Sequence, residues 1–556
     1  MAKLGMPIDW QEHKDIFSRE CESAFKKYVT DLESPARLQN AVLEDIIAIS
    51  RKALHWREQK FSDVVTDQRS FRANLPIMRY EDFEPLLERE AQSKGGVLTC
   101  SPVMRWLKTS GTTGVPKRIP YTLHWLQRYR IPAMKVLWGN YHRHFPDIFS
   151  HRYAILDTQT VREDVSDYLH GVEHQAISNR HPKINEHDWN PPWYDEPWFS
   201  PSMPISHEHK MYHRIRNFIG KKLHCISAIN PSTLISLREH LYKHRETLAA
   251  EVRDGTLDGK PFCAPNPELA DHIARTLADN TFTLKDVWPE LQFYSCWLTA
   301  SAGLYNAKLD AIFPGVAKLP FMSCGSEGVT TIPVDDSAYS QPLAVGQAFF
   351  EFVPADVPLR EHIQEGRKVP TLLFNQLEAG QEYHLIMSQG NGMYRMWTGD
   401  IYHVDRIEGE LPWMHFIRRD GIFHSFTGEK LTEFHVTVAI ENTFSAIGLN
   451  LGLYICGPSW GEPPHYVVMA ETEKGPGEDA ASIAARMDTE LKKINLEYAA
   501  KRDSNRLDPV KFFTVPRDTI IRYVESKRNA ANSNQYKYKP FEKNLDFLNA
   551  INGPAS

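Results

Sequence analysis

The spacing of hydrophobic residues divides the chain into a helical beginning and a second half rich in short strands. Between residues 10 and 61, apolar side chains recur at helical spacing with charged residues between them, as at Val42, Ile46 and Ile49. This pattern predicts two or three amphipathic helices. Residues 75–83 then predict an extended segment that enters a short helix.

After about residue 293 the apolar runs shorten and are separated by Gly, Pro and charged residues, which predicts antiparallel strands. These runs are residues 348–353, 371–374, 383–387 and 413–417. Beyond Gly428 the pattern of apolar residues changes again. It predicts a unit of strand, strand, helix and strand, at residues 453–456, 466–469, 483–498 and 512–515. A unit of this size forms a small separate domain. We therefore predict two domains, residues 1–427 and 428–556, without an internal repeat.

The composition narrows the function classes. The 556 residues are 42% hydrophobic and 24% charged, as in an ordinary soluble protein with more than one domain. A net charge of -6 argues against a nucleic-acid-binding surface. The seven cysteines are scattered without a CxxC pair, which is typical of reduced thiols. No run reaches the ~20 apolar residues of a membrane helix, and the first residues lack the apolar core of a signal peptide. We expect a cytoplasmic protein that does not enter membranes.

The first candidate for chemistry is residues 109–117, T-S-G-T-T-G-V-P-K, which follow a predicted buried strand at residues 103–107. Glycines let the backbone approach a ligand closely, and hydroxyls, N–H groups and a lysine donate hydrogen bonds to phosphate oxygens. A Walker A loop is excluded, because Pro116 replaces its second glycine and Arg118 follows the lysine. A surface turn rich in Ser, Thr and Gly is the alternative. A helix predicted over residues 121–145 would place the loop near a helix N-terminus.

Residues 142–213 are rich in His, Trp and Pro, which raises the question of a metal site. No HExxH motif or cysteine pair accompanies these histidines, so solvated or hydrogen-bonded histidines are the better interpretation. The stretch also contains four aromatic residues that favour a flat apolar acid as ligand, namely Trp189, Trp193, Tyr194 and Trp198.

Three later stretches of sequence favour the phosphate-binding interpretation of residues 109–117 over a surface turn. They are residues 319–328 (L-P-F-M-S-C-G-S-E-G), residues 392–400 (G-M-Y-R-M-W-T-G-D) and residues 416–421 (F-I-R-R-D-G), the last continuing to G-E-K-L-T-E at residues 428–433. In this order after the phosphate loop, they resemble the motifs of adenylate-forming enzymes, which include acyl-CoA synthetases, adenylation domains of peptide synthetases and luciferases.

One branch of that superfamily is more similar, the Gretchen Hagen family of acyl acid–amido synthetases. The family carries G-L-Y-R-Y-R-x-G-D, W-P-x-L, F-F-E-F-x-P and N-Q-Y-K, which this chain matches at residues 392–400, 288–291, 349–354 and 534–537. The resemblance runs from about Leu75 to Lys539. It implies an α/β fold in which a large N-terminal adenylate-forming domain, with mixed sheets and a β-barrel-like part, precedes a small α+β C-terminal domain.

The resemblance also implies a reaction. A carboxylate attacks the α-phosphate of ATP, which gives acyl-AMP and pyrophosphate, and an amine such as an amino acid then forms an amide. ATP and Mg²⁺ are the implied cofactors, the acid and the amine are small molecules, and we expect a monomer. Two alternatives stay open: an acyl-CoA synthetase, in which a thiol takes the acyl group, and a catalytically silent nucleotide-binding relative.

The resemblance assigns roles to residues of this chain. Glu327 is expected to hold Mg²⁺ and, with Lys430 and Lys537, to be catalytic, Lys537 being the adenylation lysine. Asp400 is expected to accept hydrogen bonds from the ribose hydroxyls. The nucleotide-binding set is Thr109, Ser110, Gly111, Thr112, Thr113, Gly114, Lys117, Gly325, Ser326, Tyr394, Asp400 and Arg419.

Two departures from the family pattern affect the expected site. Ser323 stands where the superfamily has an aromatic residue that stacks on adenine, so Phe321 or Met322 is a candidate substitute. Trp397 replaces the second arginine of Y-R-Y-R, which removes a charge expected near the nucleotide or the acid. Neither departure changes Glu327 or Asp400, so we expect adenylation to persist.

The two half-reactions predict motion of the small domain. A lysine that covers the phosphates during adenylation must later make way for the nucleophile. Residues 418–433 join the two predicted domains, and Gly421 and Gly428 can absorb large changes in φ and ψ. We therefore expect the small domain to turn about this segment after pyrophosphate leaves.

Overall fold

The structure is a computed structural model that describes most of the chain. The described residues are 10–93, 95–108, 117–158, 168–175, 207–229, 231–299, 303, 305–337, 339–420, 423–424, 426, 429, 431–461, 463–473, 480–503, 507–530, 538–542 and 544–552. Several predictions therefore fall on residues outside this part: those for residues 109–116, the four aromatic residues between 189 and 198, Gly421, Gly428, Lys430 and Lys537.

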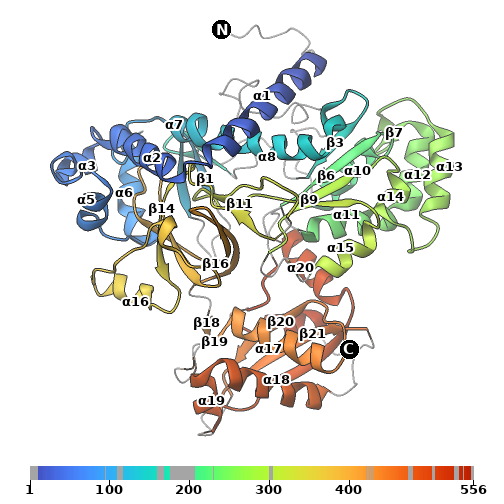
Figure 1. Cartoon of the computed structure of the whole chain (residues 1–556). Helices are drawn as coiled ribbons and strands as arrows, with labels where there is room; N and C mark the ends of the chain where they lie inside the picture. Colours follow the sequence, from blue (N-terminus) through green and yellow to red (C-terminus); the bar gives the residue numbers. More distant parts are fainter. Residues whose placement is uncertain are drawn as a thin grey trace.

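Helices form the beginning of the chain, as predicted (Figure 1). They are α1 (Trp10–Asp31), α2 (Pro35–Ser50), α3 (Leu54–Glu58), α4 (Phe61–Val64), α5 (Gln68–Asn74) and α6 (Tyr80–Ser93). Helix α1 packs along α8 (Ile131–His144). The contact requires Gly139, because a Cβ there would lie 2.4 Å from the carbonyl oxygen of Cys21.

The predicted phosphate loop connects two strands. Strand β1 (Val103–Lys108) pairs antiparallel with β2 (Arg118–Thr122), and Lys108 lies opposite Arg118. A helical stretch begins only after β2, as α7 (Leu123–Trp125), the π-helix η1 (Leu126–Arg130) and then α8. The prediction that a helix N-terminus supports the loop is therefore wrong, because a whole strand separates the two.

A five-stranded antiparallel sheet follows in the order β13-β17-β16-β15-β14. Its strands are β13 (Gln341–Pro342), β14 (Phe349–Pro354), β15 (Glu382–Ser388), β16 (Met396–Glu408) and β17 (Leu411–Arg419). Three of the four predicted strands are confirmed. The fourth is not, since Leu372 makes only an isolated bridge with Phe352 before the 3-10 helix η5 (Phe374–Gln376). Strand β16 was not predicted, although it carries Asp400.

A second sheet, which the sequence analysis did not predict, is parallel and has the order β10-β9-β6-β3. Its strands are β3 (Ala154–Asp157), β6 (Leu223–Ser227), β9 (Phe293–Cys296) and β10 (Ala317–Pro320). Helices α10 (His207–Phe218), α11 (Pro231–Lys243), α12 (Arg245–Asp254), α13 (Pro267–Thr276), α14 (Leu284–Val287) and α15 (Asn306–Ile312) belong to this lobe (Figure 1). Strands β3, β6 and β9 are buried along their whole length, as is usual for parallel strands covered on both faces.

The C-terminal unit, defined here as the elements from β19 to α21, has the predicted order of strand, strand, helix and strand. Its elements are β19 (Leu431–Thr432), α17 (Glu433–Ala446), β20 (Tyr454–Ser459), β21 (His465–Thr472), α18 (Ala480–Ile494), α19 (Leu496–Asp503), β22 (Lys511–Pro516), α20 (Thr519–Ala530) and α21 (Asp546–Asn552). The predicted single helix is interrupted at Asn495. The domain boundary near residue 427 stays a prediction.

Shorter elements complete the chain. They are η2 (Pro146–Phe149), β4 (Tyr168–Leu169), β5 (Val172–Gln175), β7 (Thr256–Leu257), β8 (Lys260–Pro261), β11 (Ser323–Cys324), β12 (Val329–Thr331), α16 (Leu359–Gln364) and β18 (Phe423–His424).

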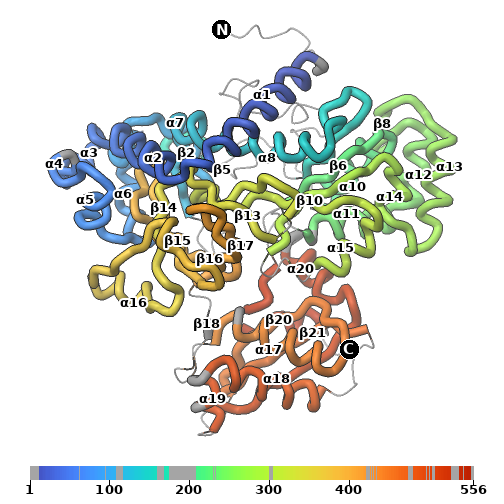
Figure 2. The backbone as a smooth tube through the Cα atoms, viewed as in Figure 1, coloured from blue at the N-terminus to red at the C-terminus, as the bar shows by residue number. Residues whose placement is uncertain are grey.

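The C-terminal unit rests against the lobe that contains the parallel sheet (Figure 2). Apolar residues of α20, among them Ile520 and Val524, share one hydrophobic core with residues of α10, α11 and α15. Ion pairs add to this contact. Lys308, on α15 of the lobe that contains the parallel sheet, pairs with two carboxylates of the C-terminal unit: its Nζ lies 2.8 Å from Asp518 Oδ1 and 3.2 Å from Oε2 of the buried Glu471.

Glu239, on α11 in this interface, makes the stability of the protein depend on pH. Burial, together with the negative charges of Glu525 and Asp518, raises its pKa from 4.5 to about 7, against the opposing charges of Lys308 and Arg522. The folded state therefore holds this proton more tightly than the unfolded state, and its stability falls as pH rises from about 4.5 to about 7.

We expect Glu239→Gln to raise the melting temperature at pH 8 by roughly 2–4 °C, and to change it little at pH 5. Thermal unfolding followed by circular dichroism at both pH values measures the difference. An equal shift at pH 5 and pH 8 would show that the carboxyl group does not titrate in this interval.

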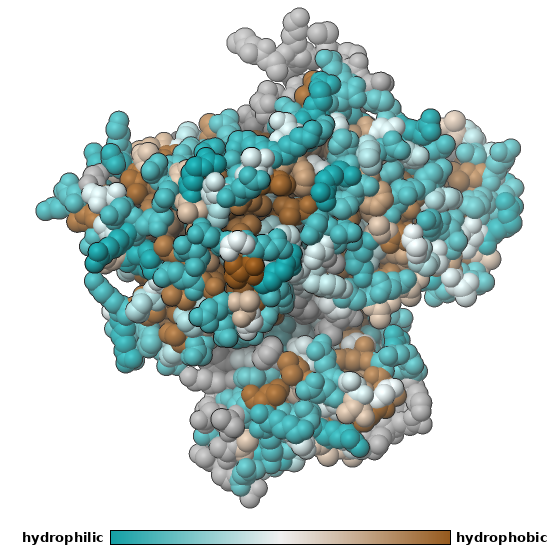
Figure 3. Space-filling view, in the orientation of Figure 1, coloured by the Kyte–Doolittle hydropathy of each residue, from teal (hydrophilic) through white to brown (hydrophobic). Residues whose placement is uncertain are grey.

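Most of the surface drawn in Figure 3 is hydrophilic, with hydrophobic residues scattered over it. None of the described helices combines the length and the apolar character needed to cross a membrane.

Candidate active site

Glu327 lies in a tight turn between β11 and β12. The turn is closed by Gly325, whose N–H donates to the carbonyl oxygen of Gly328 at 2.8 Å. The Glu327 carboxylate folds back over Gly325, where a Cβ would lie only 2.5 Å from Oε2. A glycine at position 325 therefore lets the carboxylate take this position. We retain the predicted contact of Gly325 and Ser326 with a nucleotide as a proposal.

Gln389, which the sequence analysis did not single out, supports this turn from the end of β15. Its side-chain amide donates a hydrogen bond to the main-chain oxygen of Glu327. A Cβ at Gly328 would overlap this amide, at 1.6 Å from Nε2. The packing of Gln389 thus explains why a glycine, Gly328, follows Glu327 in the motif.

Asp400 and Arg419 form an ion pair across two neighbouring strands. The residues lie opposite each other in the pairing of β16 with β17, and Arg419 Nε donates to Asp400 Oδ1 at 2.8 Å. Gly399 has a φ of 80°, a conformation that favours glycine, and its carbonyl oxygen accepts a hydrogen bond from the N–H of Asp420 at 2.5 Å. The T-G-D of the motif therefore shapes the backbone that presents Asp400.

The same arginine connects Asp400 to Glu327. Arg419 Nη2 lies 3.9 Å from Glu327 Oε1. The charge of Asp400 raises the pKa of Arg419, and that of Glu327 adds to the effect, while burial opposes both. The three side chains keep some exposure, 20% for Asp400, 33% for Arg419 and 12% for Glu327, so they can reach a ligand. The structure thus brings together three predicted residues from three separate motifs.

Lys117 is the described end of the predicted phosphate loop. Its Nζ lies 4.8 Å from the centre of the Tyr80 ring, in a cation–π contact. The hydroxyl of Tyr80 accepts a hydrogen bond from the N–H of Arg118 at 2.6 Å. Tyr80, at the start of α6, therefore anchors the strand that leaves the loop.

Tyr394 lies apart from the set formed by Glu327, Asp400 and Arg419. Its ring is buried in the core against Trp56 and Phe61, and its hydroxyl donates to the carbonyl oxygen of Ile46 at 2.5 Å and also contacts Ser50. The prediction that Tyr394 contacts the nucleotide is therefore replaced by a structural role.

Trp397, the second departure from the family pattern, is also a core residue. Its indole packs with Val353, Leu359 and Ile386, and the guanidinium of Arg360 lies 5.0 Å from the ring centre. The expected loss of a charge near the nucleotide or acid therefore does not apply. The arginine that remains in the motif, Arg395, forms a buried ion pair with Glu351.

Ser323, the first departure from the family pattern, forms a hydrogen bond with a residue of the antiparallel sheet. Its hydroxyl lies 2.8 Å from the hydroxyl of Tyr402. Phe321 and Met322 are buried in a core cluster with Tyr141 and Phe293, so neither can present a face to adenine. The suggestion that one of them replaces the missing aromatic residue is wrong.

A resident metal centre made by the protein alone is not found in the described part. Those residues contain no group of three or more His, Cys, Asp or Glu side chains that could hold a metal ion. His213, in the histidine-rich stretch, lies on helix α10 and pairs with Asp258 at 2.7 Å. Glu327 alone with phosphate oxygens is a suitable ligand set for Mg²⁺, which usually binds one or two carboxylates and keeps several waters.

The chain matches three consecutive domains of one family. The GH3 family N-terminal domain matches residues 24–318, the central domain matches residues 342–419 and the C-terminal domain matches residues 434–545. The chain belongs to the GH3 family. This confirms the resemblance to the Gretchen Hagen enzymes that the motifs indicated, and the N-terminal match alone covers more than half of the chain.

Curated members of the GH3 family are similar at low identity. The "Indole-3-acetic acid-amido synthetase GH3.17" of Arabidopsis thaliana is 24% identical over 447 residues, which cover 73% of this chain and 72% of the relative. The "Jasmonoyl--L-amino acid synthetase GH3.5" of Oryza sativa subsp. japonica is 22% identical over 90% of this chain and 91% of its own length.

A solved GH3 structure has the same fold. The AtGH3.15 acyl acid amido synthetase, in complex with 2,4-DB, superposes with a TM-score of 0.78 at 19% identity, covering 98% of this chain and 97% of that chain. The predicted fold class, an α/β protein with a large N-terminal part and a small α+β C-terminal part, is thereby confirmed.

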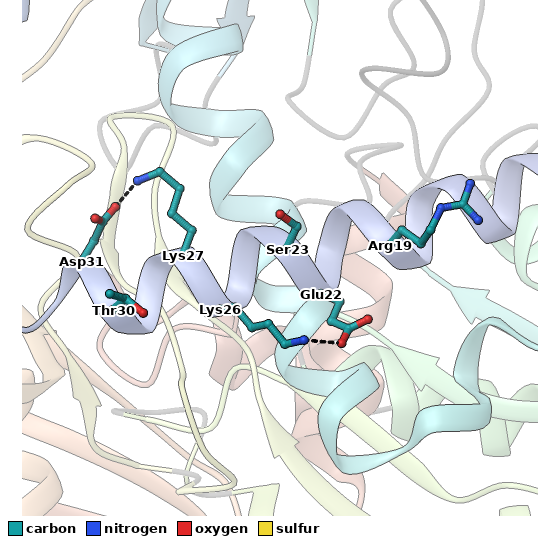
Figure 4. A pocket seen from close by; sticks show the side chains of 7 residues that line it. All are labelled: Arg19, Glu22, Ser23, Lys26, Lys27, Thr30 and Asp31. Atoms are coloured by element: carbon teal, nitrogen blue, oxygen red, sulfur yellow. Dashed lines mark hydrogen bonds and ion pairs between the residues drawn. The ribbon is translucent and has the colours of Figure 1, made fainter.

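A surface hollow along α1 is unrelated to this set of residues. It has a volume of about 570 Å³ and is open to solvent. Figure 4 shows that its side chains come from one helix and that four of the charged ones form pairs, Lys26 with Glu22 and Lys27 with Asp31. None of the predicted site residues lines it.

Proposed function

We propose that this GH3 family member is an ATP-dependent ligase that activates a carboxylic acid as acyl-AMP and transfers the acyl group to an amine, forming an amide. The observation that carries the proposal is the convergence of Glu327, Asp400 and Arg419 in one ion-paired set. Two of the GH3 relatives named above are amido synthetases, which supports an amide as the product. The third is a jasmonoyl–L-amino acid synthetase, which supports an amino acid as the amine.

In this proposal each residue of the set has a separate task. Asp400, held by Arg419, accepts hydrogen bonds from the ribose hydroxyls. The Glu327 carboxylate holds Mg²⁺, which neutralises the charge that accumulates on the phosphates when the acid attacks the α-phosphorus. The loop at residues 109–114 and Lys117 bind the phosphates, and Lys430 and Lys537 add positive charge from the small domain.

The same proposal includes a turn of the C-terminal unit between the two half-reactions. We propose that the segment at residues 418–433 is the joint, and that the boundary of the two domains lies near residue 427. We further propose that the protein acts as a cytoplasmic monomer.

Product analysis separates this proposal from its alternatives. Purified protein is incubated with ATP, Mg²⁺ and a panel of carboxylic acids, with amino acids or with coenzyme A, and products are identified by mass spectrometry. We expect acid-dependent pyrophosphate release and an amide. A thioester in place of an amide would support an acyl-CoA synthetase, and ATP binding without turnover of any acid would support a silent relative.

Lys117 is expected to matter less than Glu327. Because its ammonium lies on the Tyr80 ring and other donors of the loop remain, Lys117→Ala should lower acid-dependent pyrophosphate release by about 10-fold or less. Lys117→Arg, which keeps the charge, is the matched control. Abolished adenylation in Lys117→Ala beside a nearly normal Glu327 variant would reverse the assigned roles.

A further inference from the structure

Position 323 leaves the proposed nucleotide site without the ring that stacks on the base. The hydroxyl of Ser323 is hydrogen-bonded to that of Tyr402, and the two preceding residues, Phe321 and Met322, are buried in the core. Tyr402 itself is buried and bonded through its hydroxyl. If a nucleobase binds here, another aromatic surface has to receive it.

Two half-buried rings lie next to this pair. The ring of Phe416 is 5.7 Å from that of Tyr402, and the ring of Trp297 is 5.5 Å from that of Phe416. Both Phe416 and Trp297 keep partial exposure, unlike Tyr402. They are therefore the aromatic residues beside Tyr402 that are not fully buried.

The two rings come from different sheets. Phe416 is on β17 of the antiparallel sheet, whereas Trp297 directly follows β9 of the parallel sheet. Ligands of open parallel sheets bind outside the carboxyl ends of the strands. Trp297 is at such an end, and its contact with Phe416 brings that end to the sheet that carries Asp400.

The rings lie at a suitable distance from Asp400. Tyr402 is two residues beyond Asp400 on β16, and Phe416 is directly opposite Tyr402. Two residues of a strand span about 7 Å. A nucleoside whose ribose hydroxyls meet Asp400 can therefore place its base against this aromatic pair.

We propose that Trp297 and Phe416 form the surface on which the adenine of ATP stacks, in place of the ring that is missing at position 323. The inference rests on the proposed function, because it takes Asp400 as the ribose ligand. Stacking of a base on an aromatic side chain is strong enough to control affinity and does not need hydrogen bonds to the base.

The test compares two ligands that differ only in the base, AMP and ribose 5-phosphate. Equilibrium binding of each is measured by calorimetry with the wild type, Trp297→Leu and Phe416→Leu. We expect the wild type to bind AMP more tightly than ribose 5-phosphate, and each substitution to reduce that preference by roughly 5- to 100-fold. Damage to the fold or to the phosphate site would weaken both ligands equally.

Two further variants control the measurement. Trp297→Phe keeps a ring and should retain most of the preference for AMP. Trp413→Leu removes a ring from the same strand as Phe416, one on which Arg406 is stacked at 3.7 Å, and should leave the preference unchanged.

The proposal is overturned if both leucine variants keep the wild-type preference for AMP, or if the wild type has no such preference. It is also overturned if these variants raise only the KM for the acid, since the rings would then hold the acid. Because AMP binding needs no turnover, the surface can be established even if no acid is adenylated, and the proposed function can hold even if the surface is elsewhere.

Discussion

Replacing Glu327 with glutamine is expected to lower acid-dependent pyrophosphate release by about 100- to 1,000-fold, since the loss of one preorganised electrostatic group in a transition state has this magnitude. Glutamine has nearly the shape of glutamate, and Gln389 bonds the main-chain oxygen of residue 327, so the turn should persist. The variant loses the negative charge that we propose holds Mg²⁺. Its activity should also require a higher Mg²⁺ concentration.

Glu408→Gln is the matched control for this experiment. Glu408 lies on β16 of the same antiparallel sheet, but its carboxylate pairs with Arg406 at 2.7 Å and belongs to no part of the proposed site or joint. We expect its rate to stay within about threefold of the wild type. Steady-state kinetics over a range of Mg²⁺ concentrations provide the comparison, and a Glu327→Gln enzyme that matches the control would exclude the metal-binding role.

The second large effect concerns stability. Arg395 and Glu351 are 4% and 0% exposed, and Arg395 Nη2 lies 2.8 Å from Glu351 Oε1. Arg395 also donates to the carbonyl oxygens of Arg72 and Leu75, which joins the end of α5 to the antiparallel sheet. Arg395→Met leaves Glu351 as a buried carboxylate, with Thr371 as a hydrogen-bond donor and Arg72 at 3.6 Å.

We expect Arg395→Met to reduce the free energy of unfolding by about 3–5 kcal/mol, the usual result of breaking a buried pair. The double variant Arg395→Met/Glu351→Met removes the buried charge as well, so it should be more stable than the single variant. Urea denaturation followed by fluorescence measures both. A single variant that loses less than about 1 kcal/mol, or a double variant that is the less stable of the two, would contradict this account.

Local motifs pointed to three residues that the structure brings together, and their role in binding a nucleotide stays a proposal. Asp400 and Arg419 were assigned from separate motifs, and the pairing of β16 with β17 places them opposite each other. Glu327 was found in the same way. The motifs did not reveal why their other residues are present: Gly328 makes room for Gln389, and Arg395 is half of a buried ion pair. These partners are distant in the sequence, so no local pattern identifies them.

The predictions that proved wrong also depend on partners that are distant in the sequence or on how strands pair. Tyr394 stands in a motif beside functional residues, but its burial against Trp56 depends on helices at the other end of the chain. The helix expected after the phosphate loop begins one strand later, because β2 pairs with β1 before the chain turns. The parallel sheet was missed because three of its four short strands, β3, β6 and β9, are buried throughout and lack the alternation that marks an exposed sheet.

The central claim, that the acid is activated as an acyl adenylate before the amine attacks, can be tested by following one oxygen atom. In the proposed reaction a carboxylate oxygen bonds to the α-phosphorus as pyrophosphate leaves. The amine then attacks the carbonyl carbon, the bond from that carbon to the bridging oxygen breaks, and the oxygen stays with AMP. The enzyme is incubated with an acid in which both carboxylate oxygens are ¹⁸O, together with ATP, Mg²⁺ and the amino acid, and AMP is analysed by mass spectrometry. This account predicts one ¹⁸O atom in each AMP formed and none in the pyrophosphate. Unlabelled AMP, or ADP with ¹⁸O in inorganic phosphate, would contradict it.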